Sequence, residues 1–244
     1  MKNVSIVIPA FNEEERLPAT LAKIHAYAKQ SLDRYEVIVV DDGSKDQTVR
    51  IAQLNGCRVL CNGKNRGKGY SVKQGMLVAK YETVLFTDAD LSTPITELDK
   101  FLPLLAESDF LIASRNCVGA QRVEDQGILR KLMGKIFSVA VRLIAGCKVT
   151  DSQCGFKVFK RDVAQEVFSR QTFEGFSFDV EILHIAERLG FTFKEVPVIW
   201  KNDRRSTVRP IRDSIRMFRD VVRVRFNSWT GAYRFHLWEA KVKV

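Results

Sequence analysis

The sequence predicts an α/β fold in which helices cover both faces of a doubly wound, mostly parallel sheet. Near-continuous apolar runs, such as residues 4–8 and 35–40, are typical of strands that are buried on both faces. Strand-then-helix units follow one another along the chain, which is the pattern of a parallel sheet with crossover helices. Acidic residues end two of these strands, and open α/β sheets bind their ligands at the carboxyl ends of the strands.

The first strand, residues 4–8, leads into a loop that ends at a predicted helix. Asn12 and Glu15 are three residues apart, as in a capping box, and an apolar stripe at 17, 21 and 24 follows them. The ring of Phe11 either stacks on a nucleobase in the crevice or closes a hydrophobic staple at the start of the helix.

The second strand ends on the acids of the run Asp41-Asp42-Gly43-Ser44-Lys45-Asp46. We expect one of them to cap the next helix and the other to face the crevice, where it can accept hydrogen bonds from a base or ribose. A third strand, residues 58–60, leads to the basic, glycine-rich loop 62–69. This loop lacks the spacing of a Walker A motif or a dinucleotide fingerprint, so it is either an anion site at the start of a helix near Tyr70 or a solvated turn.

The fourth strand, residues 84–87, ends on two carboxylates, Asp88 and Asp90. Such a pair at the crevice is repulsive unless a cation lies between the two groups, and hard oxygen ligands suit Mg²⁺ or Mn²⁺. In the alternative interpretation both are loop acids, and Asp90 or Thr93 caps the following helix. Two further elements are expected after it, a helix over 95–106 and a strand over 109–113.

Composition indicates the class of partner. The 244 residues include 39 Lys and Arg against 29 Asp and Glu, and the net charge of +10 favours an anionic partner: a nucleotide, a lipid phosphate, a membrane surface or nucleic acid.

Five cysteines without C-x-x-C spacing predict reduced thiols in a cytoplasmic protein rather than a zinc site. Because no signal peptide and no apolar run of about 18 residues is present, we expect no transmembrane helix and at most a peripheral location on the cytoplasmic face of a membrane.

A set of motifs resembles inverting family 2 glycosyltransferases of the GT-A fold. In chain order these motifs are residues 7–14, 40–48, 65–69, 88–90 and 114–115. Within the family, residues 151–157, 176–181 and 195–200 are most similar to polyprenyl-phosphate sugar synthases, above all the dolichyl-phosphate β-glucosyltransferases. The resemblance extends over residues 4–226. It implies a UDP-sugar donor, with UDP-glucose as the first choice, and a polyprenyl phosphate acceptor.

The resemblance also implies roles for individual residues. The expected metal ligands are Asp88, Asp90 and Ser92, the last at a position that is Gln in related mannosyl enzymes. Donor-binding residues are expected at Pro9, Ala10, Phe11, Asn12, Glu13, Asp41, Asp42, Arg66, Gly67, Lys68, Asp88, Ala89 and Asp90. Acceptor-binding residues are expected at Arg115, Arg130, Gln153, Arg204, Arg205, Ser206 and Arg209. The expected catalytic residues are Asp88, Asp90, Arg115, Arg130 and Asp179.

The expected reaction is a single in-line displacement, which inverts the anomeric carbon and gives a β-linked product. Mg²⁺ or Mn²⁺ would act as a Lewis acid toward the departing UDP. A phosphate monoester has a second pKa of about 6, so such an acceptor is already anionic and needs no general base. If the acceptor is a hydroxyl, Asp179 and Glu181 are the candidates for a base; otherwise they cap a helix or hold arginines of the acceptor loop.

We expect residues 1–200 to form the catalytic domain and residues 201–244 to form a basic amphipathic segment at the membrane surface. Arginines at 212, 216, 219 and 223 recur at helical spacing beside apolar residues at 211, 215, 218 and 222. A second amphipathic helix is expected over 127–146. In the alternative interpretation the apolar faces of both helices pack on the sheet.

Rival functions remain at this level. Another family 2 transferase could use GDP-mannose or UDP-N-acetylglucosamine, or a hydroxyl acceptor. A nucleic-acid-binding module is disfavoured, because the basic residues are spread over several elements without a nucleic-acid motif, and we expect no nucleic-acid partner. A nucleotidyltransferase would share the sheet but carries a glycine-rich N-terminal loop that is missing here. The oligomeric state is left open.

Overall fold

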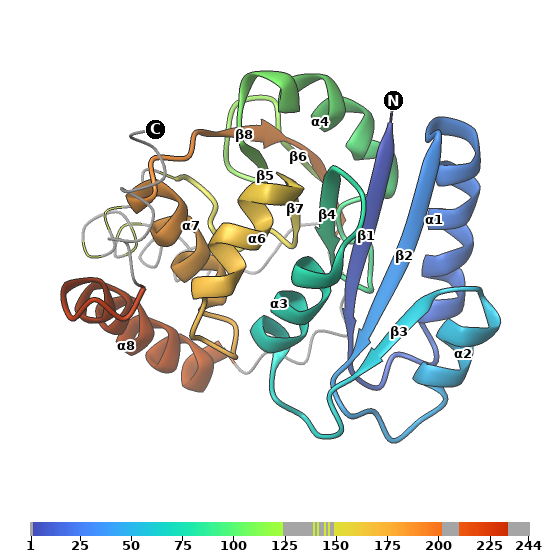
Figure 1. Cartoon of the computed structure of the whole chain (residues 1–244), viewed down its shortest axis with the longest axis horizontal. Helices are drawn as coiled ribbons and strands as arrows, with labels where there is room; N and C mark the ends of the chain where they lie inside the picture. The colour runs from blue at the N-terminus through green and yellow to red at the C-terminus, as the bar shows by residue number, and fades with distance from the viewer. Residues whose placement is uncertain are drawn as a thin grey trace.

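The computed structural model describes residues 2–123, 139, 141, 144, 146, 149–201 and 210–233, without the side chains of residues 210–217. Its centre is a seven-stranded sheet with the order β3-β2-β1-β4-β7-β5-β8 (Figure 1). The strands are β1 (Asn3–Ala10), β2 (Arg34–Asp41), β3 (Arg58–Cys61), β4 (Thr83–Thr87), β5 (Phe110–Ser114), β7 (Phe156–Lys160) and β8 (Phe193–Pro197). A small second sheet pairs β6 (Gln121–Arg122) with β9 (Ile199–Trp200).

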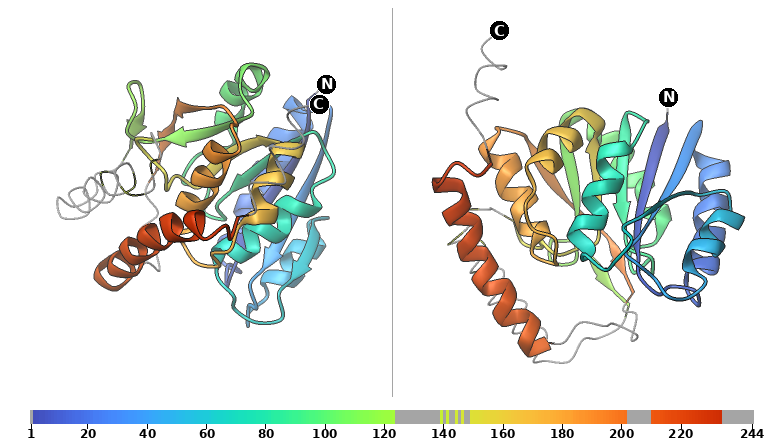
Figure 2. Two further views of the ribbon diagram at one scale, coloured as in Figure 1. Left: turned by 60° about the vertical axis from the view of Figure 1, so that its left-hand side comes forward. Right: turned by 60° about the horizontal axis from the view of Figure 1, so that its bottom comes forward.

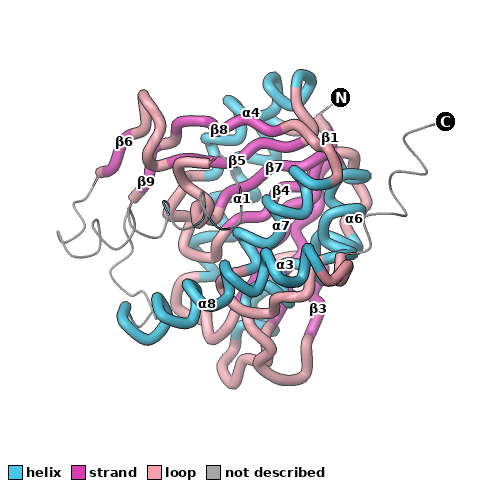
Figure 3. The backbone as a smooth tube through the Cα atoms, turned by 90° about the vertical axis from the view of Figure 1, so that its left-hand side faces the viewer, coloured by secondary structure: helices cyan, strands magenta, loops and turns pink. Residues whose placement is uncertain are grey.

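Helices cover both faces of the sheet, as the sequence predicts (Figures 2 and 3). One core cluster joins the strands to α3 (Lys68–Val78), α6 (Arg161–Arg170), α7 (Phe178–Arg188) and α8 (Pro210–Trp229). The cluster on the other face includes α1 (Leu17–Ser31), α2 (Thr48–Leu54) and α4 (Leu98–Leu104), with the 3-10 turns η1 (Ile95–Glu97) and η2 (Leu105–Glu107) on either side of α4.

All five predicted strands are present, and the sheet is mostly parallel. β1 pairs in parallel with β2 and β4, β2 with β3, and β5 with β8. The exception is β7, which the sequence analysis did not predict as a strand and which lies antiparallel between β4 and β5. Its pattern is misleading because Lys157 stands in the middle of the buried sheet, where an ion pair with Asp179 compensates its charge.

The capping box predicted at Asn12 is wrong. α1 begins at Leu17 rather than at a capping box on Asn12, because Asn12 has a φ of 54° and its side chain accepts a hydrogen bond from the Lys45 N–H at 2.9 Å. The N–H of Asn12 donates to Ser44 Oγ, so the loops after β1 and β2 hold each other. The helix predicted over 95–106 is confirmed: η1, α4 and η2 follow one another without a gap over 95–107, with Pro103 inside α4.

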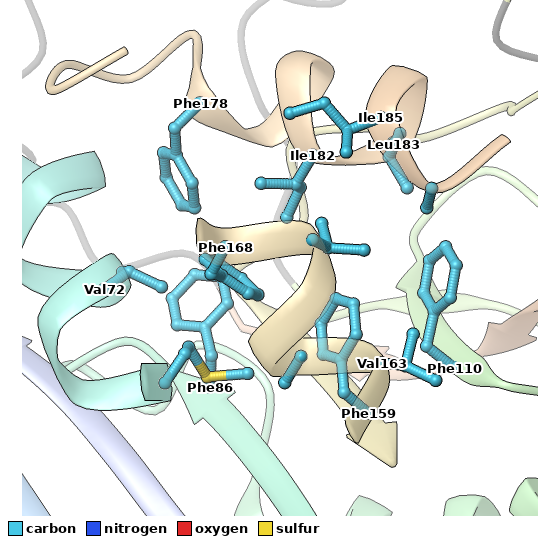
Figure 4. Close-up of a cluster of buried hydrophobic side chains, with 14 of the residues drawn as sticks. Val72, Phe86, Phe110, Phe159, Val163, Phe168, Phe178, Ile182, Leu183 and Ile185 are labelled. Carbon is cyan, nitrogen blue, oxygen red and sulfur yellow. The ribbon is translucent and has the colours of Figure 1, made fainter. Parts of the chain in front are cut away.

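Aromatic packing places α7 beside the end of β4 (Figure 4). Phe86 of β4 meets the ring of Phe178, the first residue of α7, edge-on with centroids 5.7 Å apart. Farther into the same cluster, Phe110 stacks on Phe159 at 4.8 Å. All four rings are fully buried. Because Phe178 anchors the first turn of α7, the next residue, Asp179, is brought to the carboxyl end of β4.

The C-terminal helix α8 packs on the body of the protein through Val221 and Val224, and Tyr233 beyond it is buried as well. Across the described ranges, none of the helices combines the length and apolarity needed to cross a membrane. The four cysteines in the described part of the chain are free thiols. The helix predicted over 127–146 lies almost wholly outside the described residues, and the boundary at residue 200 stays a prediction.

Candidate active site

A pocket of about 950 Å³ opens at the carboxyl ends of β1, β2 and β4. The loop between α6 and α7, residues 171–177, and the middle of α8 close its other side. Its lining brings together residues from six separate stretches of the chain. They are Pro9, Ala10, Phe11, Glu13, Arg16, Asp42, Asn65, Arg66, Gly67, Lys68, Ser71, Asp88, Ala89, Asp90, Thr172, Phe173, Glu174, Gly175, Phe176, Ser177, Arg219, Asp220 and Arg223.

Most of the predicted donor-binding residues line this pocket, but Asn12 and Asp41 do not. Asp41 is buried, and its carboxylate accepts hydrogen bonds from the N–H groups of Gly43 and Ser44 within its own turn. Phe11 is 43% exposed at the pocket, so its ring is available to a ligand rather than buried in a staple.

Asp42 holds the basic loop 62–69 in place. Its carboxylate accepts hydrogen bonds from the N–H groups of Arg66 and Gly67 at 2.9 and 2.8 Å, and from Asn62 Nδ2 at 2.8 Å. Neither Asp41 nor Asp42 caps the next helix; the third acid of the run, Asp46, accepts a hydrogen bond from the N–H of Thr48 at the start of α2. Asp42 acts by shaping the loop that carries the pocket's basic side chains.

The basic loop is not a solvated turn. Arg66 pairs with Glu174 across the pocket and lies 3.6 Å from the centre of the Tyr70 ring. Gly67 has a φ of 108°, and a Cβ there would lie 2.5 Å from the backbone oxygen of Glu174. The equivalent Cβ at Gly69 would lie 2.7 Å from the backbone oxygen of Gly175. These glycines are required because two loops meet backbone to backbone.

Asp88 and Asp90 both face the pocket, and their surroundings fit a divalent cation. A Cβ at Gly155 would lie 1.9 Å from Asp88 Oδ2, so this carboxylate fits only because residue 155 is a glycine and leaves the space open. Asp90 accepts a hydrogen bond from the Ser92 N–H at 2.8 Å, and it lines the pocket beside Asp88. Burial and the neighbouring charge of Asp88 raise the pKa of Asp90, and a cation would relieve that repulsion.

The third predicted ligand, Ser92, does not line the pocket. Among the described residues, no group of three or more His, Cys, Asp or Glu side chains converges as a metal site. An ion at Asp88 and Asp90 would therefore take most of its ligands from a bound diphosphate and water, which is the usual coordination of Mg²⁺.

Two lysines neutralise the acids around this point. Lys68 Nζ lies 2.7 Å from Asp88 Oδ1, and Lys157 Nζ lies 2.5 Å from Asp179 Oδ1. Burial opposes the charge on Lys68, but the carboxylates of Asp88, Asp179 and Asp90 outweigh it and raise its pKa. Burial raises the pKa of Asp179, although both lysines oppose that effect. Asp179, predicted as a catalytic residue, does not line the pocket and is held in a buried ion pair with Lys157.

Arg115 and Asp151 form a second ion pair next to the pocket. The guanidinium of Arg115 donates from Nε and Nη2 to the two oxygens of Asp151, both at 2.7 Å, and lies 5.4 Å from the centre of the Trp200 ring. Burial disfavours the Asp151 carboxylate, but the charge and hydrogen bonds of Arg115 hold its pKa below the usual range. Glu195 fixes the Asp151 backbone through the N–H at 3.0 Å. Arg115 does not line the pocket, and its position is fixed by the ion pair with Asp151 and the contact with Trp200.

The remaining predicted acceptor residues contribute little to the described pocket. Gln153 does not line it, and its Nε2 is buried without a hydrogen-bond partner among the described atoms. The rest lie outside the described residues: Arg130, Arg204, Arg205, Ser206 and Arg209.

Sequence reasoning missed the wall formed by residues 172–177 and α8. Glu181, considered as a base, accepts hydrogen bonds from the N–H groups of Thr172 and Phe173 and from Thr172 Oγ1. Asp220 of α8 accepts a hydrogen bond from Ser177 Oγ at 2.7 Å, which links the loop to the helix. The helical spacing of the arginines was visible in the sequence, but which of them reach the pocket was not.

Comparison with known proteins decides what this site belongs to. The profile described as Glycosyl transferase family 2 matches residues 5–168, which include the basic loop, Asp88 and Asp90. The chain belongs to glycosyltransferase family 2. As a family 2 transferase it is an enzyme that moves a sugar.

Curated relatives of this family 2 chain extend beyond the matched region. It is 34% identical to a dolichyl-phosphate beta-glucosyltransferase of Drosophila melanogaster, over 98% of this chain and 79% of the relative. The proteins of the same name from Homo sapiens and Saccharomyces cerevisiae are 33% and 30% identical, over 96% and 95% of this chain and 78% and 76% of theirs.

Solved structures confirm the GT-A fold of the transferase. Mannosyl-3-phosphoglycerate synthase from Rubrobacter xylanophilus superposes with a TM-score of 0.71 at 24% identity, covering 94% of this chain and 75% of that one. Glucosyl-3-phosphoglycerate synthase from Mycobacterium tuberculosis, crystallised with Mn²⁺, UDP and glucosyl-3-phosphoglycerate, gives a TM-score of 0.68 at 21% identity, over 93% of this chain and 79% of that one.

Proposed function

We propose that this family 2 enzyme transfers glucose from UDP-glucose to a polyprenyl phosphate of the dolichyl type and gives a β-linked product. The observation that carries the proposal is the 30–34% identity to dolichyl-phosphate beta-glucosyltransferases over 95–98% of the chain. The pocket supports it, because one cavity joins an exposed aromatic ring, an acidic pair and basic side chains. These are the groups that a base, a metal-bound diphosphate and a second phosphate need.

The donor would occupy the β1 side of the pocket. Phe11 offers a face to the uracil, and the basic loop held by Asp42 offers Lys68 to the diphosphate. When bound at Asp88 and Asp90, Mg²⁺ or Mn²⁺ would supply Lewis-acid stabilisation of the leaving diphosphate. The carboxylates of this chain orient the donor by fixing where the diphosphate can lie.

The acceptor would approach from the α8 side. Arg219 and Arg223 line the pocket there, and Arg223 lies 5.6 Å from the centre of the Phe173 ring. Guanidinium groups bind phosphate through paired hydrogen bonds and can hold two anions near each other. In the proposed step, an acceptor phosphate oxygen forms a bond to the anomeric carbon while the bond from that carbon to the diphosphate breaks. UDP leaves with the bonding electrons, and no proton is transferred.

The outer face of α8 supports a membrane-surface location for this reaction. Phe218, Val222, Phe226 and Trp229 are 47%, 48%, 60% and 74% exposed, and their spacing puts them on one stripe of the helix. The stripe lies opposite the buried Val221 and Val224, and arginines flank it. An apolar stripe beside cationic groups suits the surface of an anionic bilayer, which we assign to the cytoplasmic leaflet.

A donor and acceptor screen tests the proposed reaction. The purified enzyme is incubated with UDP-glucose, UDP-N-acetylglucosamine or GDP-mannose, with Mn²⁺ or Mg²⁺, and with a short polyprenyl phosphate or the corresponding polyprenol. Transfer from UDP-glucose to the phosphate alone is expected. Preference for another donor changes the assigned sugar, and transfer to the polyprenol in place of the phosphate overturns the assigned acceptor.

Vesicle co-sedimentation tests the membrane surface separately. Phe218→Ser with Phe226→Ser should reduce binding to anionic vesicles at least fivefold. Val118→Ser should not, because Val118 is a 99% exposed apolar residue of the loop between β5 and β6 and is not part of the α8 stripe. Equal binding by the two variants, or no binding by the unmodified protein, would remove the proposed membrane role while leaving the donor screen unaffected.

A further inference from the structure

Of the two carboxylates assigned to the metal, that of Asp88 forms an ion pair with the ammonium group of Lys68. Lys68 Nζ contacts Asp88 Oδ1 at 2.7 Å, and it also lies 5.5 Å from the centre of the Phe86 ring. The other oxygen of Asp88 rests against Gly155, where even a Cβ would come within 1.9 Å. Gly155 therefore borders this carboxylate on one side, and the ammonium of Lys68 lies at its other oxygen.

Of the two lysines at this point, only Lys68 is placed to move. Lys157 is fully buried, and its ammonium donates to Asp179 Oδ1 and to the backbone oxygen of Cys154. The side chain of Lys68 is 22% exposed, is the first residue of α3, and lines the pocket in which the donor would bind. A rotation of the Lys68 side chain would release Asp88 without breaking the buried pair beneath it.

We infer that Lys68 is a built-in counter-ion, which holds Asp88 while the metal is absent and moves to the nucleotide diphosphate when metal and donor bind. The inference deepens the proposed function and rests on it, because it assumes that the pocket takes a divalent cation and a nucleoside diphosphate. One positive charge would thus serve two anions in turn. In the empty site it prevents repulsion between Asp88 and its neighbours, and in the loaded site it neutralises the diphosphate.

The exchange predicts how the two ligands bind. A metal ion that arrives alone must displace an ammonium from Asp88 and leave that ammonium without a carboxylate partner. When the diphosphate is present, the ammonium gains a new anionic partner at the same time. The metal and the nucleotide should therefore strengthen each other's binding by the same factor, and part of that factor should depend on Lys68.

Binding of Mn²⁺ without any turnover tests the inference. The free ion is followed by electron paramagnetic resonance during titration, with and without UDP, for the unmodified protein, Lys68→Met and Lys64→Met. Lys64 is a matched control, because it is an exposed lysine of the same loop and removing it changes the net charge equally. Loss of a partly exposed ion pair should tighten binding of Mn²⁺ alone about three- to tenfold in Lys68→Met.

The expected pattern has two parts. Lys68→Met binds Mn²⁺ alone more tightly than Lys64→Met does, and UDP tightens Mn²⁺ binding less in Lys68→Met than in the unmodified protein. If Lys68→Met binds Mn²⁺ alone no more tightly than Lys64→Met does, the inference is overturned. Lys68→Gln repeats the comparison with a polar side chain if the Met variant does not fold, as judged by circular dichroism.

Failure of the proposed function gives a different result. If the unmodified protein binds no Mn²⁺ even with UDP, the metal assignment at Asp88 and Asp90 is wrong, and the inference falls with it. If Mn²⁺ binds with UDP but does not respond to Lys68, the metal assignment stands and only the exchange is refuted.

Discussion

Gly155→Ala is expected to damage the metal site without touching any charged group. The backbone at Gly155 has no positive φ, so alanine itself is tolerated there, but its Cβ would lie 1.9 Å from Asp88 Oδ2. To regain ordinary contact at 3.4 Å, the carboxylate must retreat by about 1.5 Å. Because β4 anchors Asp88 in the central sheet, the shift has to come from the side chain and the end of the strand.

The expected size of the effect follows from that displacement. Misplacing a reacting or positioning group by about 1 Å costs on the order of 100-fold in rate, equivalent to about 2.7 kcal/mol of transition-state stabilisation. We therefore expect turnover to fall about 100-fold and Mn²⁺ affinity in the presence of UDP to fall at least tenfold. The overpacking should lower the free energy of unfolding by only about 1–3 kcal/mol, so the protein should remain folded.

Val118→Ala is the control, because Val118 is 99% exposed and does not line the pocket. Turnover of this variant should stay within about threefold of the unmodified enzyme. Initial rates of UDP release, Mn²⁺ titration and urea unfolding are measured for all three proteins. If Gly155→Ala turns over and binds Mn²⁺ as Val118→Ala does, Asp88 does not depend on the space at Gly155 and the assignment of the metal site loses its main geometric support.

Three further predictions concern the buried charges. Lys157→Met should lower the free energy of unfolding by about 3–5 kcal/mol in urea titrations, because it leaves Asp179 buried without its partner. Adding Asp179→Leu should recover much of this loss, and a double variant no more stable than Lys157→Met would refute this account of the pair. Asp151→Asn should be less stable than the unmodified protein at pH 7, and the difference should shrink as the pH falls. The sign follows because the folded-state pKa of Asp151 is depressed, so its stabilisation is present above the unfolded pKa of about 3.9 and is lost as the pH falls through the folded value; a difference that grows toward pH 3 contradicts it. Glu181→Ala removes the acceptor for the N–H groups of Thr172 and Phe173, so we expect faster proteolysis of residues 171–177 and a raised KM for the donor, and an unchanged cleavage rate would show that the loop is held by other contacts.

The sequence predicted the sheet well because its evidence is local. Each apolar run with a carboxylate after it is visible in a few residues, and the five predicted strands and the positions of Asp88 and Asp90 at the pocket are confirmed. β7 was missed because Lys157 breaks its apolar pattern. Only the fold brings Asp179, 22 residues away, close enough to neutralise that lysine. A compensated buried charge cannot be recognised from a window of sequence.

The roles of the loop residues were harder to predict because they depend on which loops meet. Asn12 and Glu15 have capping-box spacing, yet Asn12 holds the loop after β2 instead. The glycines of the basic loop suggested a phosphate cradle, whereas Gly67 and Gly69 are required by the backbone of residues 174–175. The pairing of Lys68 with Asp88 could not be predicted for the same reason, because the basic loop and the end of β4 become neighbours only in the folded chain.

The central claim is that Asp88 and Asp90 hold a divalent cation against the diphosphate of the donor. Diffraction from crystals grown with Mn²⁺ and UDP, recorded at the manganese absorption edge, tests it most directly. The account predicts an anomalous peak bonded to a carboxylate oxygen of this pair and to the diphosphate, and the absence of the peak in Asp88→Asn with Asp90→Asn. Bound UDP with no anomalous peak at these two residues would contradict the claim.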